Sequence, residues 1–445
     1  MLNITISGAD LEAALEQSKL EGLDISAVEA DVHKLSESNL DSSASQNEAF
    51  QLLLSMSKLP VNSGYQYDEP AVPEGGSVIL DSIATGDTGS THDLSDHMEG
   101  AWLGMCIGIR VASALRNIPR KTAIEALKSA SLWPISSLNN SFELASQVYT
   151  SNGTTTDMLE MHQQSQCWGA HRITDHALAA LSMVEQNGEE FLPVELAKFC
   201  KINFTSAIPA NSFDNLLWSG ENDNVPPSIS PYREDSSALS TSVIWGLIAA
   251  DNPPRAAQLA TANAAISHTK NGLYTCSWLA SLAASSCEEM TVPDMITESL
   301  AHIPANSRLA DVLESVLEWY SLDIDLETAV YRVHELWNEA NALHRYHSIP
   351  NAMIIAIALI WSGWQFDTAL HAAVTSGFDV VGNTAAVCAV VGAHCGREEI
   401  GEQWLISGYD NLSTASGSSN MVSLSDAAGR TYNLVQTLRN YAQIR

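Results

Sequence analysis

The chain has 445 residues, 45% of them hydrophobic, and a mean hydropathy of −0.01. Such a length and composition allow a large core and exclude a disordered chain. The formal net charge is −31, from 21 Lys and Arg against 52 Asp and Glu. Because so acidic a chain repels nucleic-acid phosphates and anionic lipids, we expect neither nucleic acid nor membrane as a partner.

The cysteines and the apolar segments indicate the cellular compartment in which the protein resides. The seven cysteines show no CxxC spacing, and most lie among apolar or small residues, which favours buried reduced thiols over disulfides or a zinc site. The N-terminal residues lack a basic region followed by an apolar run, and the longest apolar stretch, 352–361, is about half a bilayer span. We therefore expect a cytoplasmic protein.

The first 95 residues divide into two parts. Residues 5–58 show helical periodicity in LEAALEQSKLEGL, AVEADVHKL and FQLLLSMSKL, with Gly22 ending the first helix. The following segment is rich in Pro, Gly, Ser, Thr and Asp, which is typical of a loop or linker. We predict an N-terminal helical extension over 1–58 and a wrapping linker over 59–95.

The rest of the chain, 96–445, is predicted to be one domain. Helical patterns follow one another, as in HMEGAWLGMCIGIRVASALRN, SRLADVLESVLEWY and NAMIIAIALIWSG, whereas alternating strand patterns are scarce. Small residues on the inner faces would let helix backbones approach closely. These patterns predict an all-α fold, an orthogonal multi-helix bundle.

Four segments carry a family resemblance. They are DHMEGAWLGMCIGIRVASAL (96–115), AHRITDHALAALSMVEQNG (170–188), the region 230–284 with its PYRE, WG, DNP, SH and NGLY elements, and the region 347–396 with GFDVVGNTAAVCAVVGAHCG. In this order and spacing they resemble the ADP-ribosylglycohydrolase family, in particular a bacterial branch with an N-terminal extension. The resemblance implies an all-α fold with a central pair of Mg²⁺ ions. It also implies hydrolysis of a glycosidic bond to ADP-ribose or a related ribosyl compound.

The resemblance also shows where this chain departs from the family. The Asp-rich turn of the second segment falls on His171, Arg172 and Ile173, and only Thr174 and Asp175 still fit. In the fourth segment Asp379 fits the first Asp of the motif, and Asn383 fits the asparagine of the branch. The other ligand positions there are Val381 and Gly382, and a glutamate of the first segment aligns with Arg116.

These departures predict that the family's dimetal site is absent. Mg²⁺ prefers hard oxygen ligands, and neither isoleucine nor two arginines supply them. We therefore expect no metal cofactor. Arginines in a cleft bind phosphate or carboxylate groups, so a small-molecule ligand is the expected partner. The alternative is an ion pair between Arg172 and Asp379 that fills the site.

The candidate site residues follow from the same segments. Asn351 faces the active site in the branch, and Trp168 precedes the altered turn. We predict His171, Arg172, Asp175 and Asp379 as catalytic residues, and Arg116, Trp168, Thr174, His176, Asn351 and Asn383 as ligand-binding residues. His347 lies one helical turn before Asn351 and either shares its face, caps a helix or lies at the surface, and Arg233 and Glu234 are expected to tie down loops.

Three functions are compatible with this sequence. The first is a repurposed, metal-independent enzyme that acts on a small molecule in the former ribosyl pocket. The second is a non-catalytic module that binds ADP-ribose, a nucleotide or a protein. The third is a Mg²⁺-dependent glycohydrolase whose metal site has shifted. No feature of the sequence indicates an oligomeric state.

Overall fold

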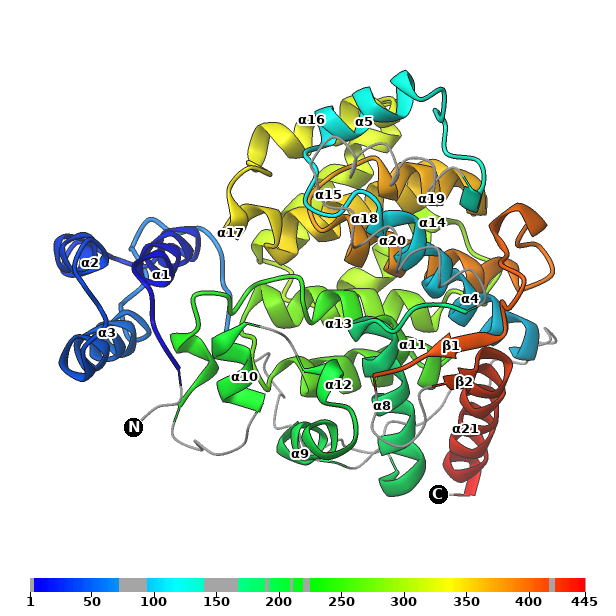
Figure 1. The fold of residues 1–445 in the computed structure, drawn as a ribbon, viewed down its shortest axis with the longest axis horizontal. Coiled ribbons are helices and arrows are strands. Elements are labelled where there is room, and N and C mark those ends of the chain that lie inside the picture. The colour runs from blue at the N-terminus through cyan, green and yellow to red at the C-terminus, as the bar shows by residue number, and fades with distance from the viewer. Residues whose placement is uncertain are drawn as a thin grey trace.

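The computed structural model describes residues 4–71, 94–139, 167–188, 191, 193–208, 211–218, 225–415 and 421–444. Within these ranges the chain is helical apart from one antiparallel pair of three-residue strands, β1 and β2, so the predicted all-α fold is confirmed (Figure 1). The principal elements are α1 (Gly8–Leu20), α2 (Glu29–Ser36), α3 (Ser43–Met56), α4 (Leu94–Ser113), α5 (Arg120–Ser129), α8 (Arg172–Asn187), α9 (Pro193–Asn203), α10 (Ser212–Trp218), η4 (Leu239–Thr241), α11 (Val243–Ile248), α12 (Pro253–Ala264), α13 (Asn271–Ala284), α14 (Val292–Ser299), α15 (Arg308–Ser321), α16 (Leu326–Leu336), α17 (Ala342–Arg345), α18 (Ser348–Ser362), α19 (Phe366–Val374), α20 (Val380–Cys395), β1 (Asn411–Ser413), β2 (Met421–Ser423) and α21 (Leu424–Ile444).

The first three helices form a unit with its own small core. Leu11, Val32 and Leu53 are buried among them, and Phe213 of α10 joins the same cluster from the main body. In Figure 1 these helices lie at the left, beside the main body. A capping box starts α1 and a serine cap starts α3, where Ser7 and Ser42 accept hydrogen bonds from backbone N–H groups.

Helices α4 and α20 pack against each other along glycines. A Cβ on Gly100, Gly104 or Gly108 would collide with the backbone of α20, where the carbonyl oxygens of Gly392, Cys388 and Thr384 face them in that order. We call this contact the glycine seam. The reversed order makes the two helices antiparallel, so the C-terminal end of α4 lies beside the N-terminal end of α20.

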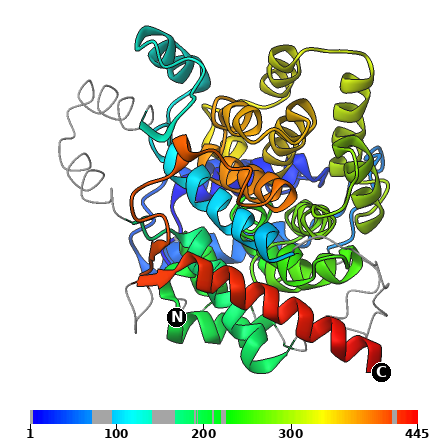
Figure 2. The same ribbon diagram turned by 90° about the vertical axis from the view of Figure 1, so that its right-hand side faces the viewer.

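Other helices surround this pair and complete one large core. Nearly every residue of α13, α18 and α20 is buried. The C-terminal helix α21 crosses the outside of α4, and the Trp102 indole donates a hydrogen bond of 3.0 Å to the Thr431 hydroxyl (Figure 2). The seven cysteines are all free thiols, as predicted.

A buried charge network joins the N-terminal unit to the main body. The guanidinium of Arg233 donates to Glu21 of α1 at 2.6 Å, and Gln17 of α1 donates to Glu234 at 2.7 Å. Arg308 of α15 binds Glu234 and Glu69, both at 2.8 Å. Arg233 and Glu234 therefore tie segments together, as the sequence predicted.

Residues 60–62 bond to the segment after α1, and residues 66–70 lie against α13, α15 and the turn before α15. Tyr67 donates to Asp311, Asn306 donates to the Gln66 carbonyl, and the Tyr274 hydroxyl donates to the Pro70 carbonyl. The rest of the predicted linker, 72–93, is outside the described residues, and the division into domains stays a prediction. In the described part of the chain no helix combines the length and apolar character that a membrane span requires.

Candidate functional site

A cavity of about 380 Å³ lies where the ends of three helices meet. The C-terminal end of α4, the N-terminal ends of α8 and α20, and the loop before η4 surround it. We call it the main cavity, and its lining residues are Arg116, Asn117, His171, Arg172, Ile173, Asp235, Ser236, Ser237, Ser240, Tyr346, Phe378, Asp379, Val380, Val381 and Gly382. Its volume suits a small molecule.

A strained turn presents Asp379 to the main cavity. Gly377 and Phe378 both have positive φ, 83° and 58°, and for an aromatic residue this conformation is uncommon and unfavourable. The turn is held because the Asn351 amide oxygen accepts hydrogen bonds from the Asp379 backbone N–H at 2.9 Å and from the Asn383 amide at 2.8 Å. Asn351 therefore positions Asp379 from behind.

The Asp379 carboxylate has neutral partners. It accepts hydrogen bonds from the Ser236 hydroxyl at 2.8 Å and from the Gly382 backbone N–H at 3.2 Å. Burial raises the pKa of Asp379, although both hydrogen bonds and the charge of Arg172 oppose the rise. The side chain is thus a carboxyl group that can hold a proton more readily than an exposed aspartate.

Two guanidinium groups face the main cavity. Arg172 donates to the Ser237 carbonyl at 2.9 Å and to the Ser240 hydroxyl at 3.0 Å. Arg116 lies at the exposed rim, beyond the end of α4. Among the described residues, neither arginine lies within 4.0 Å of a carboxylate, so the predicted alternative of an Arg172–Asp379 ion pair is not formed.

His171 lies between these two cations. Burial and the charges of Arg116 and Arg172 lower its pKa to about 3, so the ring is neutral near pH 7. The Ile173 backbone N–H points at Nδ1 from 3.3 Å, and the Arg116 guanidinium lies 3.1 Å from Nε2. A neutral imidazole has one acceptor nitrogen, so only one of these two donors can be satisfied at a time.

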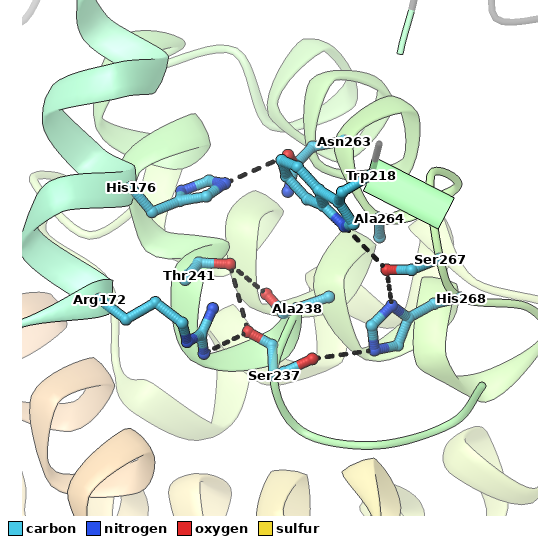
Figure 3. Close-up of a pocket in the computed structure, with 10 residues that line it drawn as sticks. All are labelled: Arg172, His176, Trp218, Ser237, Ala238, Thr241, Asn263, Ala264, Ser267 and His268. Atoms are coloured by element: carbon cyan, nitrogen blue, oxygen red, sulfur yellow. Dashed lines mark hydrogen bonds between the residues drawn. The ribbon is translucent and has the colours of Figure 1, made fainter. Parts of the chain in front are cut away.

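A second, much smaller cavity of about 10 Å³ shares Arg172 and Ser237 with the first. Figure 3 shows Arg172 and His176 reaching towards it from α8, with His268 on the opposite side. His176 is buried, and its Nε2 lies 3.2 Å from the Asn263 amide oxygen. Burial, with the charge of Arg172, lowers the pKa of His176 to about 4.

Three more ionisable groups meet beside Arg172. One ligand atom from each of Asp214, Asp235 and His268 lies within 4.8 Å of the others, and we call them the Asp–His cluster. His268 Nε2 lies 3.0 Å from Asp235 Oδ1. Burial lowers the pKa of His268, but this hydrogen bond and the charges of Asp235 and Asp214 together outweigh burial, so the pKa is raised. Burial and the charge of Asp235 raise the pKa of Asp214 to about 7.

The structure brings four of the predicted residues together. Arg116, His171, Arg172 and Asp379 line the main cavity, and His176 lines the smaller one. Asn351 and Asn383 are buried behind the Asp379 turn and do not belong to the lining. Of the alternatives for His347, the structure shows the helix cap: it begins α18 as its N-cap and accepts a hydrogen bond from the Ile349 N–H.

The other predicted residues point elsewhere. The Asp175 carboxylate accepts hydrogen bonds of 2.6 Å from the Ser206 and Thr414 hydroxyls, so it anchors those segments. Trp168 is buried and donates to the Tyr409 carbonyl at 2.7 Å. Thr174 donates to the His171 carbonyl within the first turn of α8. Among the described residues, none of these three lines either cavity.

Sequence reasoning missed part of the lining. Asp235, Ser236 and Ser237 follow PYRE directly and face the main cavity. The sequence predicts only that Arg233 and Glu234 of this segment hold loops in place. The run of short polar residues DSS between a structural motif and an apolar helix was the available signal. Asp214 gave no such signal, because it lies in a seven-residue helix outside the four resembling segments.

Known proteins with similar sequences or structures were compared with this chain. The sequence model of the ADP-ribosylglycohydrolase family matches residues 90–432. A solved structure titled "ADP-ribosylglycohydrolase-related protein complex" is similar, with a TM-score of 0.44 and 16% identity, over 77% of this chain and 98% of that chain. No curated protein matches the chain significantly. Since the family model spans well over half of the sequence, the chain belongs to the ADP-ribosylglycohydrolase family.

Proposed function

We propose that the protein is a repurposed member of its family, which binds a small anionic molecule in the main cavity and transforms it without the family's two-metal chemistry. The observation that supports this proposal is that one cavity of about 380 Å³ is lined by two guanidiniums, those of Arg116 and Arg172, and by the Asp379 carboxyl group. A cavity of this kind can hold a charged ligand and supply a proton-transfer group.

The residues around the main cavity do not fit a pair of Mg²⁺ ions. Mg²⁺ requires a near-octahedral shell of oxygen atoms, usually including carboxylates. Ile173, Val381 and Gly382 line the cavity and offer no side-chain oxygen, and the resemblance aligns them with the family's metal-ligand positions. Arg172 adds a permanent positive charge that would repel a cation. We therefore derive no step through these ions.

An anion would fit the same place. Guanidiniums form bidentate, charge-assisted hydrogen bonds with phosphate and carboxylate groups. An anion beside Arg116 and His171 would also relieve the conflict at the imidazole, because it would accept from both Arg116 and the Nε2–H of His171. The Nδ1 atom would then be free to accept from the Ile173 N–H.

Asp379 is the proposed proton-transfer residue. Its raised pKa makes it hold a proton more readily than an exposed aspartate, and the Asn351 hydrogen bonds fix its position. As a carboxylic acid it would protonate a leaving group, and as a carboxylate it would accept a proton from a nucleophile. Arg172 would stabilise negative charge that develops on the ligand.

The first test is ligand binding without metal. The purified protein is titrated calorimetrically, in EDTA, with inorganic phosphate, pyrophosphate, ADP-ribose, ribose 5-phosphate and a neutral riboside. We expect at least one anionic compound to bind and the neutral riboside to bind more weakly. In Arg116→Gln and Arg172→Gln the affinity should fall by about 10- to 100-fold, the value of one hydrogen bond to a charged group.

The matched control is Arg430→Gln on α21, whose guanidinium pairs with Glu185 at the surface. This variant should bind as the wild type does. Binding that appears only after Mg²⁺ is added would contradict the proposal and favour a Mg²⁺-dependent glycohydrolase with a shifted site.

Turnover separates an enzyme from a binding module. The bound compound is incubated with wild-type protein and with Asp379→Asn, and the products are followed by mass spectrometry. We expect conversion by the wild type and a loss of about 100-fold or more in the variant, with little change in affinity. Binding without any conversion in the wild type would instead indicate the non-catalytic module.

A further inference from the structure

The Asp–His cluster contains a buried carboxylate oxygen with no partner. Asp214 has no exposed surface, and its Oδ1 lacks a hydrogen-bond partner in the described part of the chain. Its other oxygen is held by the Asn211 side chain, which donates to Oδ2 at 2.8 Å, while Asn211 Oδ1 accepts from the Asp214 N–H at 2.8 Å. An unpaired charged oxygen in the interior is costly, so a ligand that satisfies it would bind favourably.

The imidazole of the cluster is oriented as a ligand. The Ser267 hydroxyl lies 2.9 Å from His268 Nδ1, and it also accepts a hydrogen bond from the Trp218 indole at 3.2 Å (Figure 3). When a metal ion replaces the hydrogen bond between Nε2 and Asp235, Nδ1–H would donate to Ser267 and the lone pair of Nε2 would bind the ion. Partners of this kind behind the ring fix the tautomer of metal-binding histidines.

The spacing and the charge of the cluster suit a dication. The three ligand atoms lie within 4.8 Å of one another, and the distance of 3.0 Å from His268 Nε2 to Asp235 Oδ1 is close to the separation of two ligands on one ion. Two carboxylates supply two negative charges. Arg172 lies nearby, but its guanidinium donates to the Ser237 carbonyl and the Ser240 hydroxyl rather than to the cluster, and the two carboxylates outweigh its single positive charge.

We propose that Asp214, Asp235 and His268 form a binding site for one divalent transition-metal ion, with Zn²⁺ as the best-fitting ion. The two carboxylates and one imidazole match the borderline preference of Zn²⁺ and its neighbours, whereas Mg²⁺ prefers an all-oxygen shell. This site is distinct from the family's dimetal positions at the ends of α8 and α20, and its existence does not depend on the proposed anion chemistry.

The proposed metal site lies at the wall of the main cavity. Asp235 lines the main cavity, while Asp214 and His268 lie deeper. Three protein ligands leave a coordination position open, as in catalytic rather than structural zinc sites. The ion would fix the Asp235 side chain and add positive charge beside Arg172.

The test uses the full chain, stripped with EDTA and titrated with Zn²⁺, Mn²⁺ and Mg²⁺ by calorimetry and elemental analysis. We expect one equivalent of Zn²⁺ at micromolar or lower Kd, weaker Mn²⁺ and no saturable Mg²⁺. Co²⁺ should give a visible spectrum with nitrogen and oxygen ligation. Asp235→Asn, at the cavity wall, and His268→Gln should each weaken Zn²⁺ by at least about 100-fold, and Ser267→Ala by about 10- to 100-fold.

Two controls make the result specific. Asp175→Asn and His176→Gln replace a buried aspartate and a buried histidine outside the cluster, and both should keep the Zn²⁺ equivalent. Absence of Zn²⁺ binding by the folded wild type would overturn the proposal. Binding that is equal in wild type, Asp235→Asn and His268→Gln would also overturn it, because the ion would then lie elsewhere. Neither outcome bears on anion binding in EDTA, so the two proposals fail separately.

Discussion

At the scale of single residues, the neighbours of His171 set the pKa of its imidazole. Its ring is held neutral by burial and by two guanidiniums, with a pKa of about 3 in the folded protein. In the unfolded chain an ordinary histidine takes up a proton near pH 6.5. Between these two values the unfolded state binds one more proton than the folded state, so acid favours unfolding there.

This difference predicts a change in the pH dependence of stability. The contribution of His171 is complete above pH 6.5 and is lost as the pH falls towards 3. Urea unfolding from pH 7.5 to pH 4 should show a slope in the wild type that His171→Gln reduces by up to about 1.4 kcal/mol per pH unit below pH 6.5. The comparison at pH 7.5, where the ring is neutral in both states, isolates the other effects of the substitution. An unchanged slope would mean that the folded ring already carries a proton at mild pH.

At the scale of helices, the glycine seam sets how close α4 and α20 can be. Gly104 lies in the middle of this contact, against the Cys388 carbonyl. A methyl group there has no space and would push the two backbones apart. Overpacking of this kind costs about 1–3 kcal/mol, and backbone displacement at two helices places this site at the upper end.

The prediction is that Gly104→Ala lowers the free energy of unfolding by about 3 kcal/mol, measured by urea denaturation. The matched variant is Gly429→Ala in α21, where a Cβ meets no atom within 4 Å. Because alanine favours helix over glycine, that variant should be neutral or more stable by about 1 kcal/mol. Equal effects in the two variants would show that the seam does not limit packing.

At the scale of the whole molecule, Glu234 connects parts that are far apart in sequence. Its carboxylate accepts from Gln17 of α1, from Arg308 of α15, and from the Asn271 backbone N–H at the start of α13. The charges of Arg308 and His347 and these hydrogen bonds outweigh burial and hold the pKa of Glu234 well below its usual range. The N-terminal unit and the main body therefore share one buried charge.

Removing the charge of Glu234 should lower the free energy of unfolding of the whole protein. Glu234→Gln leaves part of the positive charge of Arg308 unbalanced in the interior, a change that costs about 3–5 kcal/mol for buried pairs. Thermal and urea unfolding measure the loss. Glu29→Gln, whose partner Lys19 is half exposed, should unfold close to the wild type, because solvent screens this surface ion pair. A small loss in Glu234→Gln would mean that Glu69 alone can balance Arg308.

Much of this architecture could be predicted from the sequence, for identifiable reasons. The spacing of Gly100, Gly104 and Gly108 by four residues places them on one helix face, so a close helix contact followed directly. Arg116, His171 and Asp379 could be grouped because the family resemblance aligns each of them with a position of the family's active site. Asp175 belongs to such a segment too, but its side chain contacts Ser206 and Thr414, segments whose position no local pattern indicates.

The remaining site residues depend on tertiary contacts alone. Asp214 and His268 meet because α10 and the end of α12 converge on the loop after PYRE, and neither helix carries a pattern that points to the other. Trp168 looked like a pocket residue because it precedes the altered turn. Its pairing with Leu412 of β1 turns it into the core instead.

The glycine seam has a consequence for how this protein could change over evolutionary time. The close contact involves the middles of α4 and α20, whereas Arg116 and Asp379 lie just beyond their ends. Substitutions at those ends alter the charge of the main cavity without altering the contact that holds the helices together. Chemistry and fold are therefore encoded in separate positions of the same two helices. A lineage could exchange carboxylates for arginines step by step, and each intermediate would still fold.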